Sequence, residues 1–119
     1  MPLVRFALAG FGAWGKFHAQ SIAGNPDATL VAITAPSEAS RQEARKLYPE
    51  AQIFADSLEM IEKADFDIID IATPSHTHRE IALAAMQNGK HVLLEKPMAI
   101  TREDCKGIVA GARDHGVHL

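Results

Sequence analysis

Three glycines near the start of the chain have the spacing that proteins use to hold a phosphate chain. Gly10, Gly12 and Gly15 match G-x-G-x-x-G directly after an apolar run and at the opening of a predicted helix. In this pattern the first glycine permits a tight turn, the second leaves room for a pyrophosphate, and the third lets the helix approach the strand. Free amides at the helix start, with the positive end of its dipole, would hold the phosphates. We predict a dinucleotide-binding loop formed by Gly10, Phe11, Gly12, Ala13, Trp14 and Gly15. The alternative is a glycine-rich turn without a ligand.

The end of the second predicted strand should distinguish NAD from NADP. An Asp or Glu about 20 residues past the glycines would bind the adenosine ribose of NAD. This chain has Ala35 there and no carboxylate before Glu38, whereas Ser37 and Arg41 are close enough in sequence to approach a 2′-phosphate. The sequence therefore favours NADP, or acceptance of both forms. The alternative is that Arg41 belongs to the solvated face of a helix.

Two further polar turns follow predicted strands at their carboxyl ends, where ligands bind in open α/β sheets. Thr73-Pro74-Ser75-His76-Thr77-His78 follows the fourth strand, and Glu95-Lys96-Pro97 follows the fifth. Lys96 is a candidate cation for a substrate oxygen or a developing alkoxide. The alternative for Lys96 is an ordinary surface lysine.

The elements that must position these turns alternate between strand and helix. Apolar and β-prone runs predict strands over residues 3–9, 29–34, 52–54, 67–72 and 91–94, with a sixth over 117–119. Helical spacing and capping residues predict helices over 13–23, 38–47, 57–63, 76–87 and 101–113. This alternation predicts an α/β fold with a doubly wound parallel sheet, a Rossmann fold of strand order 3-2-1-4-5-6, covered by helices in three αβα layers.

Composition excludes several classes of protein. The chain has 119 residues, with 12 basic and 15 acidic side chains giving a net charge of −3. A nucleic-acid surface needs a basic excess that this chain lacks, and no apolar run approaches the roughly 20 residues that span a bilayer. The single cysteine, Cys105, forms no internal disulfide. We expect one cytoplasmic domain with no nucleic-acid or membrane partner.

Several polar residues are assigned no chemistry. His76 and His78 are two positions apart and do not share a helix face, so no metal site is predicted. His18 and His91 are interpreted as packing or surface residues. Asp70 interrupts the fourth strand and weakens the expectation that this strand is buried.

Taken together and in order, these motifs resemble the Gfo/Idh/MocA oxidoreductase family. The resemblance rests on the glycine loop, on Ala72-Thr73-Pro74-Ser75-His76-Thr77-His78 and on Glu95-Lys96-Pro97, and it covers the whole chain. It implies NAD(P) as cofactor and hydride transfer to or from a sugar, polyol or related hydroxyl. It also implies that Thr73, Pro74 and His78 border the cofactor cleft, that Glu95 meets the nicotinamide ribose, and that Lys96 lies near nicotinamide and substrate.

The family pairs this Rossmann domain with a second, catalytic domain. Its proton-transfer residues, typically an Asp and a His, belong to that domain, and no residue here corresponds to them. We therefore expect residues 1–119 to be the NAD(P)-binding domain alone, inactive in isolation, with oligomerisation through the missing domain. Two alternatives are a non-catalytic NAD(P)-sensing module and, less favoured, a Rossmann-like methyltransferase that binds S-adenosylmethionine.

Overall fold

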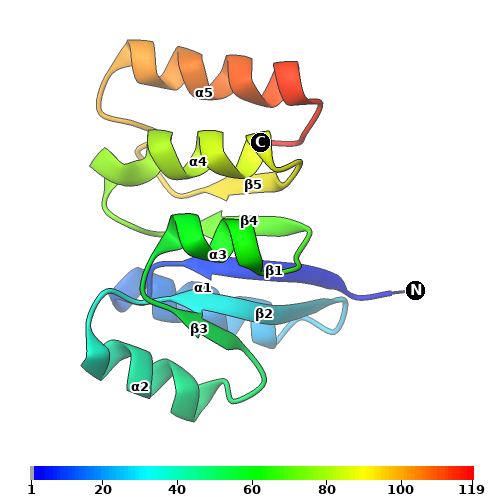
Figure 1. Ribbon diagram of the computed structural model, residues 1–119, viewed down its shortest axis with the longest axis vertical. Helices are drawn as coiled ribbons and strands as arrows, with labels where there is room; N and C mark the ends of the chain where they lie inside the picture. The colour runs from blue at the N-terminus through cyan, green and yellow to red at the C-terminus, as the bar shows by residue number, and fades with distance from the viewer. Residues whose placement is uncertain (1) are drawn as a thin grey trace.

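A five-stranded parallel sheet forms the centre of the computed structural model, which describes residues 2–119. Its strands are β1 (Val4–Ala9), β2 (Ala28–Thr34), β3 (Gln52–Phe54), β4 (Ile68–Ile71) and β5 (His91–Leu94). They lie in the order β3-β2-β1-β4-β5, and every pair is parallel (Figure 1). The chain therefore begins in the middle of the sheet, builds one half, and crosses back to build the other.

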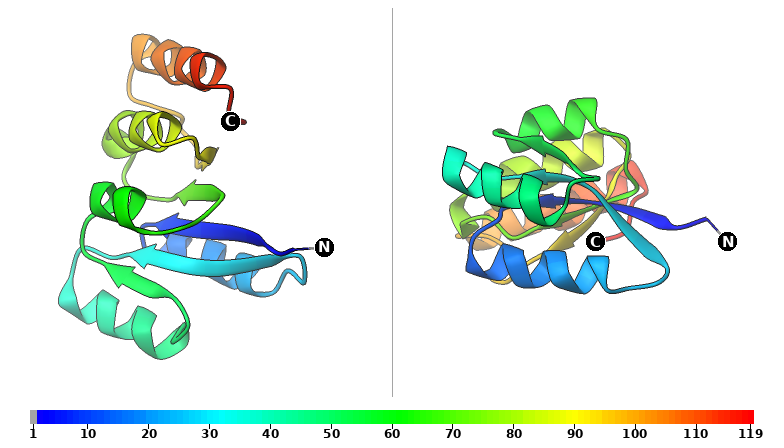
Figure 2. Two further views of the ribbon diagram at one scale, coloured as in Figure 1. Left: turned by 45° about the vertical axis from the view of Figure 1, so that its right-hand side comes forward. Right: turned by 90° about the horizontal axis from the view of Figure 1, so that it is seen from below.

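Helices cover both faces of this sheet. The cores place α1 (Ala13–Ala23) and α2 (Glu38–Leu47) on one face, and α3 (Ser57–Lys63), α4 (His78–Gln87) and α5 (Arg102–His115) on the other (Figure 2). A short 3₁₀ helix, η1 (Ser75–Thr77), precedes α4. The predicted doubly wound, three-layer fold is confirmed. Within residues 2–119, no helix combines the length and the hydropathy needed to cross a membrane.

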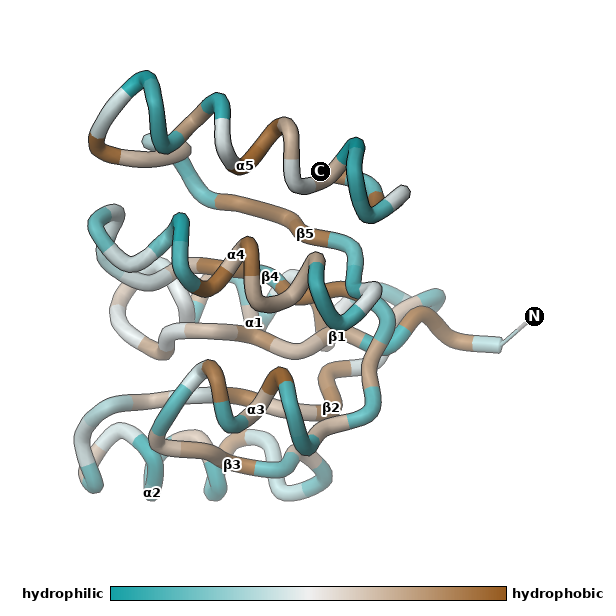
Figure 3. The backbone as a smooth tube through the Cα atoms, turned by 45° about the horizontal axis from the view of Figure 1, so that its top comes forward, coloured by the Kyte–Doolittle hydropathy of each residue, from teal (hydrophilic) through white to brown (hydrophobic). Residues whose placement is uncertain are grey.

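The strands are apolar because both of their faces are buried. In β1, Ala7, Leu8 and Ala9 are fully buried, and Leu8 faces the core under α1 and α2, whereas its neighbours face the core under α3 and α4. Figure 3 shows hydrophobic stretches along the strands and a largely hydrophilic α2. The loops that follow β1 and β4 therefore begin from the buried centre of the sheet, which fixes their starting positions.

The structure corrects the predicted sixth strand. Among residues 2–119 the sheet has five strands, and residues 117–119 belong to none of them. The segment does run beside β5, where the Val92 amide donates to the His118 carbonyl at 3.0 Å and the His118 amide donates to Nδ1 of His91 at 3.0 Å. One backbone bond does not make a ladder, so the pairing begins here without forming a strand.

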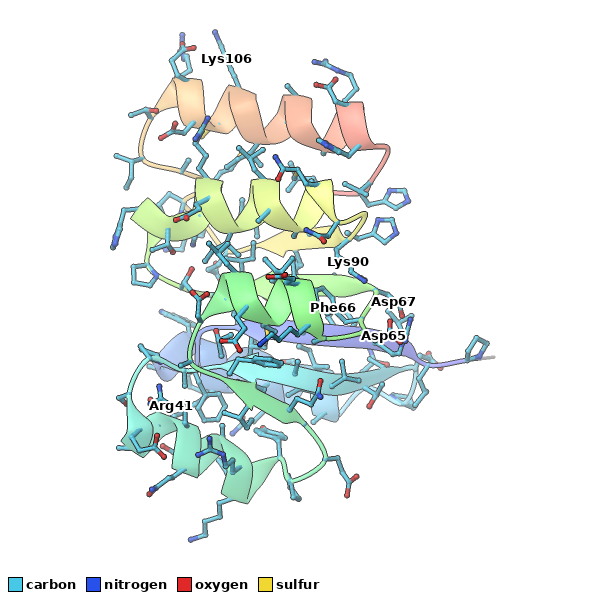
Figure 4. The ribbon with its side chains drawn as sticks, in the orientation of Figure 1. Arg41, Asp65, Phe66, Asp67, Lys90 and Lys106 are labelled. Atoms are coloured by element: carbon cyan, nitrogen blue, oxygen red, sulfur yellow. The ribbon has the colours of Figure 1, made fainter. Side chains whose placement is uncertain are left out.

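A charged cluster marks the amino edge of the sheet, opposite the glycine loop. Arg5 donates to Asp67 at 2.9 Å and to Asp65 at 2.6 Å, and Lys90 Nζ donates to the Phe66 carbonyl at 2.8 Å. Figure 4 places Asp65, Phe66, Asp67 and Lys90 at one side of the molecule and Arg41 at the opposite side. This cluster fastens the start of β1 to the start of β4 and lies far from the polar turns.

Candidate functional site

The three turns singled out in the sequence lie side by side because the ladders continue past the ends of the strands. The Ala72 amide donates to the Ala9 carbonyl at 2.8 Å, and the Glu95 amide donates to the Ile71 carbonyl at 3.1 Å. The loop after β1, the turn after β4 and the turn after β5 are thus held at one edge. This is the carboxyl edge, where open α/β sheets bind ligands.

Two glycines of the loop are required by the fold itself. Gly10 has φ of +102°, and a Cβ added there would lie 2.7 Å from the carbonyl oxygen of Ala72. A Cβ on Gly15 would collide with the carbonyl oxygen of Gly10. The predicted roles of Gly10 as the turn and Gly15 as the point of close helix approach are therefore those the backbone assigns to them.

Gly12 is different. Its φ is −79°, which any residue adopts, and a Cβ added there would meet nothing within 4 Å. The fold needs no glycine at this position. A glycine is useful there only if a group outside the chain approaches the backbone closely.

The start of α1 carries unsatisfied amides. Gly12 is the N-cap, offers no side-chain cap, and accepts the first helical hydrogen bond from Lys16 at 2.9 Å. The amides of Ala13, Trp14 and Gly15 therefore have no helical acceptor. Among the α-helices of residues 2–119, only α1 lacks an acidic residue in its first turn. This helix end favours an anion.

A cavity of about 760 Å³ opens beside this helix end, within the size range of cofactor sites. The glycine loop forms one wall, and the end of β2, the turn after β3 and the turn after β4 form the others. The lining residues beyond the loop include Thr34, Pro36, Ala55, Asp56, Ser57, Thr73, Pro74 and Thr77. Sequence reasoning missed Thr34 and residues 55–57, although their position directly at strand ends could have indicated them.

Two predicted contact residues have side chains that pack in the core. The Phe11 side chain is 2% exposed and its ring packs edge-on against Tyr48, with centroids 6.2 Å apart. Ala35 is fully buried in the same core. Phe11 is among the residues that line the cavity, whereas Ala35 is not, and the Ala35 side chain offers no polar group.

Arg41 holds the loop after β2. Its Nη1 donates to the Ala35 carbonyl at 2.9 Å and to the Pro36 carbonyl at 2.8 Å, while its Nη2 donates to Glu38 at 3.1 Å. Hydrogen bonding to Arg41 holds the pKa of Glu38 below its ordinary value. Ser37 caps α2 with its hydroxyl. Arg41 is thus fixed at the carboxyl edge with a carboxylate as one partner.

The turns after β4 and β5 are joined by His78. Thr73 and Pro74 line the cavity, but His78 is 1% exposed and lies behind them. Its Nε2 is 2.9 Å from the Thr73 carbonyl oxygen and its Nδ1 is 3.0 Å from the Pro97 carbonyl oxygen. His78 therefore supports the turn that faces the cavity from the buried side.

Glu95 is held by a network that the sequence did not indicate. Its Oε1 accepts from the Lys96 amide at 2.9 Å, and its Oε2 is 2.8 Å from Nε2 of His18. Nδ1 of the same imidazole is 2.8 Å from Asp70. Hydrogen bonding to the Lys96 amide and to His18 holds the pKa of Glu95 below its ordinary value. The available signal was Asp70 itself, since a carboxylate inside an isoleucine-rich strand requires a partner.

Lys96 is exposed beside Glu95. Within residues 2–119 its ammonium group has no hydrogen-bonded or ion-paired partner, so it is available to a ligand. The described residues also contain no group of three ligating side chains arranged for a metal ion.

Comparison with known proteins gives consistent matches. A family model described as "Oxidoreductase family, NAD-binding Rossmann fold" matches residues 4–119. Inositol 2-dehydrogenase 1 of Saccharopolyspora erythraea is 37% identical over 109 residues, covering 90% of this chain and 32% of that protein.

Solved structures agree. The WlbA dehydrogenase from Bordetella pertussis, in complex with NADH and UDP-GlcNAcA, superposes with a TM-score of 0.94 at 35% identity, covering 100% of this chain and 36% of that one. Biliverdin reductase from Synechocystis sp. PCC 6803, in complex with biliverdin and NADP+, gives 0.91 at 31% identity, covering 98% and 36%. The chain thus spans about a third of the length of its relatives.

Proposed function

Because the chain belongs to the Gfo/Idh/MocA oxidoreductase family, as the NAD-binding Rossmann domain that this family contains, we propose that it binds NAD(P) across the carboxyl edge of its sheet. In this proposal it is the cofactor-binding domain of an oxidoreductase that transfers hydride to or from a sugar, polyol or related hydroxyl. Bound there, the nicotinamide supplies or accepts the hydride.

The observation that carries the proposal is the open space at Gly12. Gly10 and Gly15 are glycines because the backbone leaves no room for a side chain, but Gly12 faces a 760 Å³ cavity, and a Cβ at this position would have no neighbour within 4 Å. The free amides of the first turn of α1 lie at the same place. A pyrophosphate needs both features, namely close backbone approach and unpaired N–H donors.

The lining residues suggest how the two halves of the cofactor are divided. The cavity reaches from the loop after β2 to Thr73 and Pro74, which suits the adenosine half. Trp14 borders both this cavity and a second groove that contains Glu95. We assign the nicotinamide half to that side, with Glu95 accepting from a ribose hydroxyl and Lys96 polarising the reacting oxygen.

Proton transfer is assigned to residues outside this chain. Hydride transfer to or from a hydroxyl needs a general acid or base, and the described residues offer Lys96 as a polarising cation without a free acid beside it. The relatives are about three times as long. We assign the catalytic domain, the substrate pocket and any oligomer contact to a region that corresponds to the other two thirds of these relatives. Inositol and UDP-GlcNAcA, named for two relatives, suggest a sugar-like substrate.

Cofactor preference leans toward NADP. Ala35 puts no carboxylate directly after β2, whereas Ser37 caps α2 two residues further on and Arg41 donates to the Ala35 carbonyl. Glu38 neutralises part of Arg41, so the expected preference is modest. Tenfold tighter binding of NADH than of NADPH would remove this part of the proposal.

Calorimetry on the wild-type chain and on Gly12→Val tests the proposal. Wild type should bind NADPH, and NADH more weakly. A valine at position 12 occupies the space assigned to the pyrophosphate, so affinity should fall about a hundredfold, the loss of roughly two charge-assisted hydrogen bonds. Urea unfolding should show a stability within about 1 kcal/mol of wild type, because only an N-cap changes.

The two measurements separate the fold from the site. Unchanged affinity in a folded Gly12→Val chain would show that the loop is only structural. A large loss of stability in the same variant would show that Gly12 is a fold requirement, and the observation that carries the proposal would then lose its force.

A further inference from the structure

Three ionisable side chains from separate segments form a continuous hydrogen-bonded network on the α1 face of the sheet. Asp70 of β4, His18 of α1 and Glu95 after β5 are joined through the two ring nitrogens of His18, with contacts of 2.8 Å on each side. The Asp70 side chain is 2% exposed, whereas the Glu95 side chain is 29% exposed. This network therefore runs from the interior of the sheet to its carboxyl edge.

Strand geometry explains why Asp70 lies on this face. Ile69 and Ile71 face the core under α3 and α4, so the residue between them faces α1. Asp70 pairs with Leu93 in the ladder, and Glu95, two residues beyond Leu93, extends to the same side. His18 reaches both carboxylates from the facing helix.

The surroundings of this Asp70–His18–Glu95 network are apolar. It lines a groove of about 410 Å³ whose walls include Phe6, Trp14, Phe17 and Leu93. In such a setting a buried carboxylate without a cation would be costly. The only cation facing Asp70 among the described residues is His18, since Lys16 on the same helix is paired with Glu43 of α2 at 3.1 Å.

The geometry suits a protonated imidazole. Each ring nitrogen faces a carboxylate oxygen, and the imidazolium, with two N–H donors, satisfies both contacts while both carboxylates stay ionised. Burial lowers the pKa of His18, but hydrogen bonds to Asp70 and Glu95 outweigh it and leave the pKa raised. Burial raises the pKa of Asp70, and His18 partly opposes this. Among the described residues, the other charge acting on Glu95 is that of Lys96.

We propose that His18 is a positioning residue for cofactor binding, whose imidazolium clamps Glu95 to the buried Asp70 and so presents Glu95 to the nicotinamide ribose. When His18 loses its proton, one nitrogen becomes an acceptor facing a carboxylate, and Glu95, the more exposed partner, is released. Affinity for the dinucleotide then falls. This inference rests on the proposed function, because it assigns a role to Glu95 in the same site.

The direction of the pH dependence follows from the raised pKa of His18. The contribution of the clamp is fully present below the ordinary histidine pKa of about 6.5 and is lost as pH rises through the higher folded value. Glu95 gives the opposite limit, because its pKa is lowered and its charge is lost only in acid. Binding should therefore be strongest between these limits and weaken on the alkaline side.

The test measures NADPH affinity against pH for wild type, His18→Gln and Asp70→Asn, with His115→Gln as control. Wild-type affinity should fall about fivefold across the His18 titration, the loss of about one hydrogen bond. His18→Gln, which does not titrate, should bind more weakly at low pH and show no such step. Asp70→Asn removes one stabilising charge, so the step should move about one pH unit lower.

His115 is the matched control because it is an exposed histidine on α5 whose ring contacts the Gly111 carbonyl of its own helix. His115→Gln should keep the wild-type profile. An alkaline step of wild-type size in His18→Gln, or an unmoved midpoint in Asp70→Asn, would overturn the proposal.

A second readout needs no cofactor. The Lys96 amide donates to Glu95, so its chemical shift in labelled wild-type chain should titrate with the same midpoint as the His18 ring. A Lys96 amide chemical shift that does not change as His18 titrates would contradict the clamp. If the amide follows His18 while NADPH fails to bind at any pH, the clamp stands as a structural device, but its role in binding is overturned together with the proposed function.

Discussion

The two halves of the carboxyl edge are built by different means. Around the glycine loop, the geometry comes from backbone packed so closely that Gly10 and Gly15 have no room for a side chain. Around the turns after β4 and β5, it comes from side chains that bridge separate segments. There His78 lies between two carbonyls and His18 between two carboxylates.

Because of this difference, the two halves should respond differently to pH and to mutation. Close-packed backbone contains no titrating group, so the phosphate-binding half should be insensitive to pH in the neutral range. The half that contains Glu95 depends on a charged imidazole and should respond to pH. The comparison therefore predicts that side-chain volume damages one half and that removal of a polar group damages the other.

The largest expected effect is at Gly15. Its added methyl group would collide with the Gly10 carbonyl, and α1 would have to move away from β1. Gly15→Ala should cost about 3 kcal/mol of unfolding free energy or more, measured by urea denaturation followed by circular dichroism.

Gly107→Ala is the matched control. This glycine lies inside α5, and a Cβ there would meet only the Arg79 side chain at 3.8 Å. The change should stabilise the helix by about 0.5–1 kcal/mol. Equal stabilities for the two variants would show that the loop can move to accept a side chain at position 15. The glycine-loop half would then not be fixed by close backbone packing.

A smaller effect is expected at His78. His78→Leu fills a similar volume but removes the two ring nitrogens that face the buried carbonyls of Thr73 and Pro97. We expect a loss of about 2 kcal/mol, again from urea unfolding. His115→Leu, at an exposed position, should change stability by no more than about 0.5 kcal/mol. A His78 variant as stable as wild type would mean that the turns do not depend on this bridge.

What the sequence predicted follows the same division. The glycine loop, the strands and the helices were predictable because their signals are local, and the boundaries agree to within a few residues. The last helix, predicted over 101–113, begins at such a local signal, because the Thr101 hydroxyl caps it by accepting from the Asp104 amide at 3.1 Å. Backbone rules apply to neighbouring residues, so a short segment carries the information.

What the sequence did not predict depends on contacts between distant segments. His18 is 52 residues from Asp70 and 77 from Glu95, and only the register of the sheet brings them together. The packing of the Phe11 ring against Tyr48 in the core is another such contact, whereas the cofactor contact expected of Phe11 stays a prediction. The sixth strand failed for a related reason, because a strand needs a ladder and residues 117–119 share one backbone bond with β5.

Amide chemical shifts during titration with NADPH test the central claim most directly, namely that the open glycine loop at the start of α1 is a dinucleotide site. In the labelled wild-type chain, the largest shifts should fall at residues 12–15 and at Thr73, with little change at Asp67 and His91 on the amino edge. S-adenosylmethionine at the same concentration should leave residues 12–15 unshifted. A folded chain in which NADPH shifts none of these amides, or only those of the amino edge, would contradict the account.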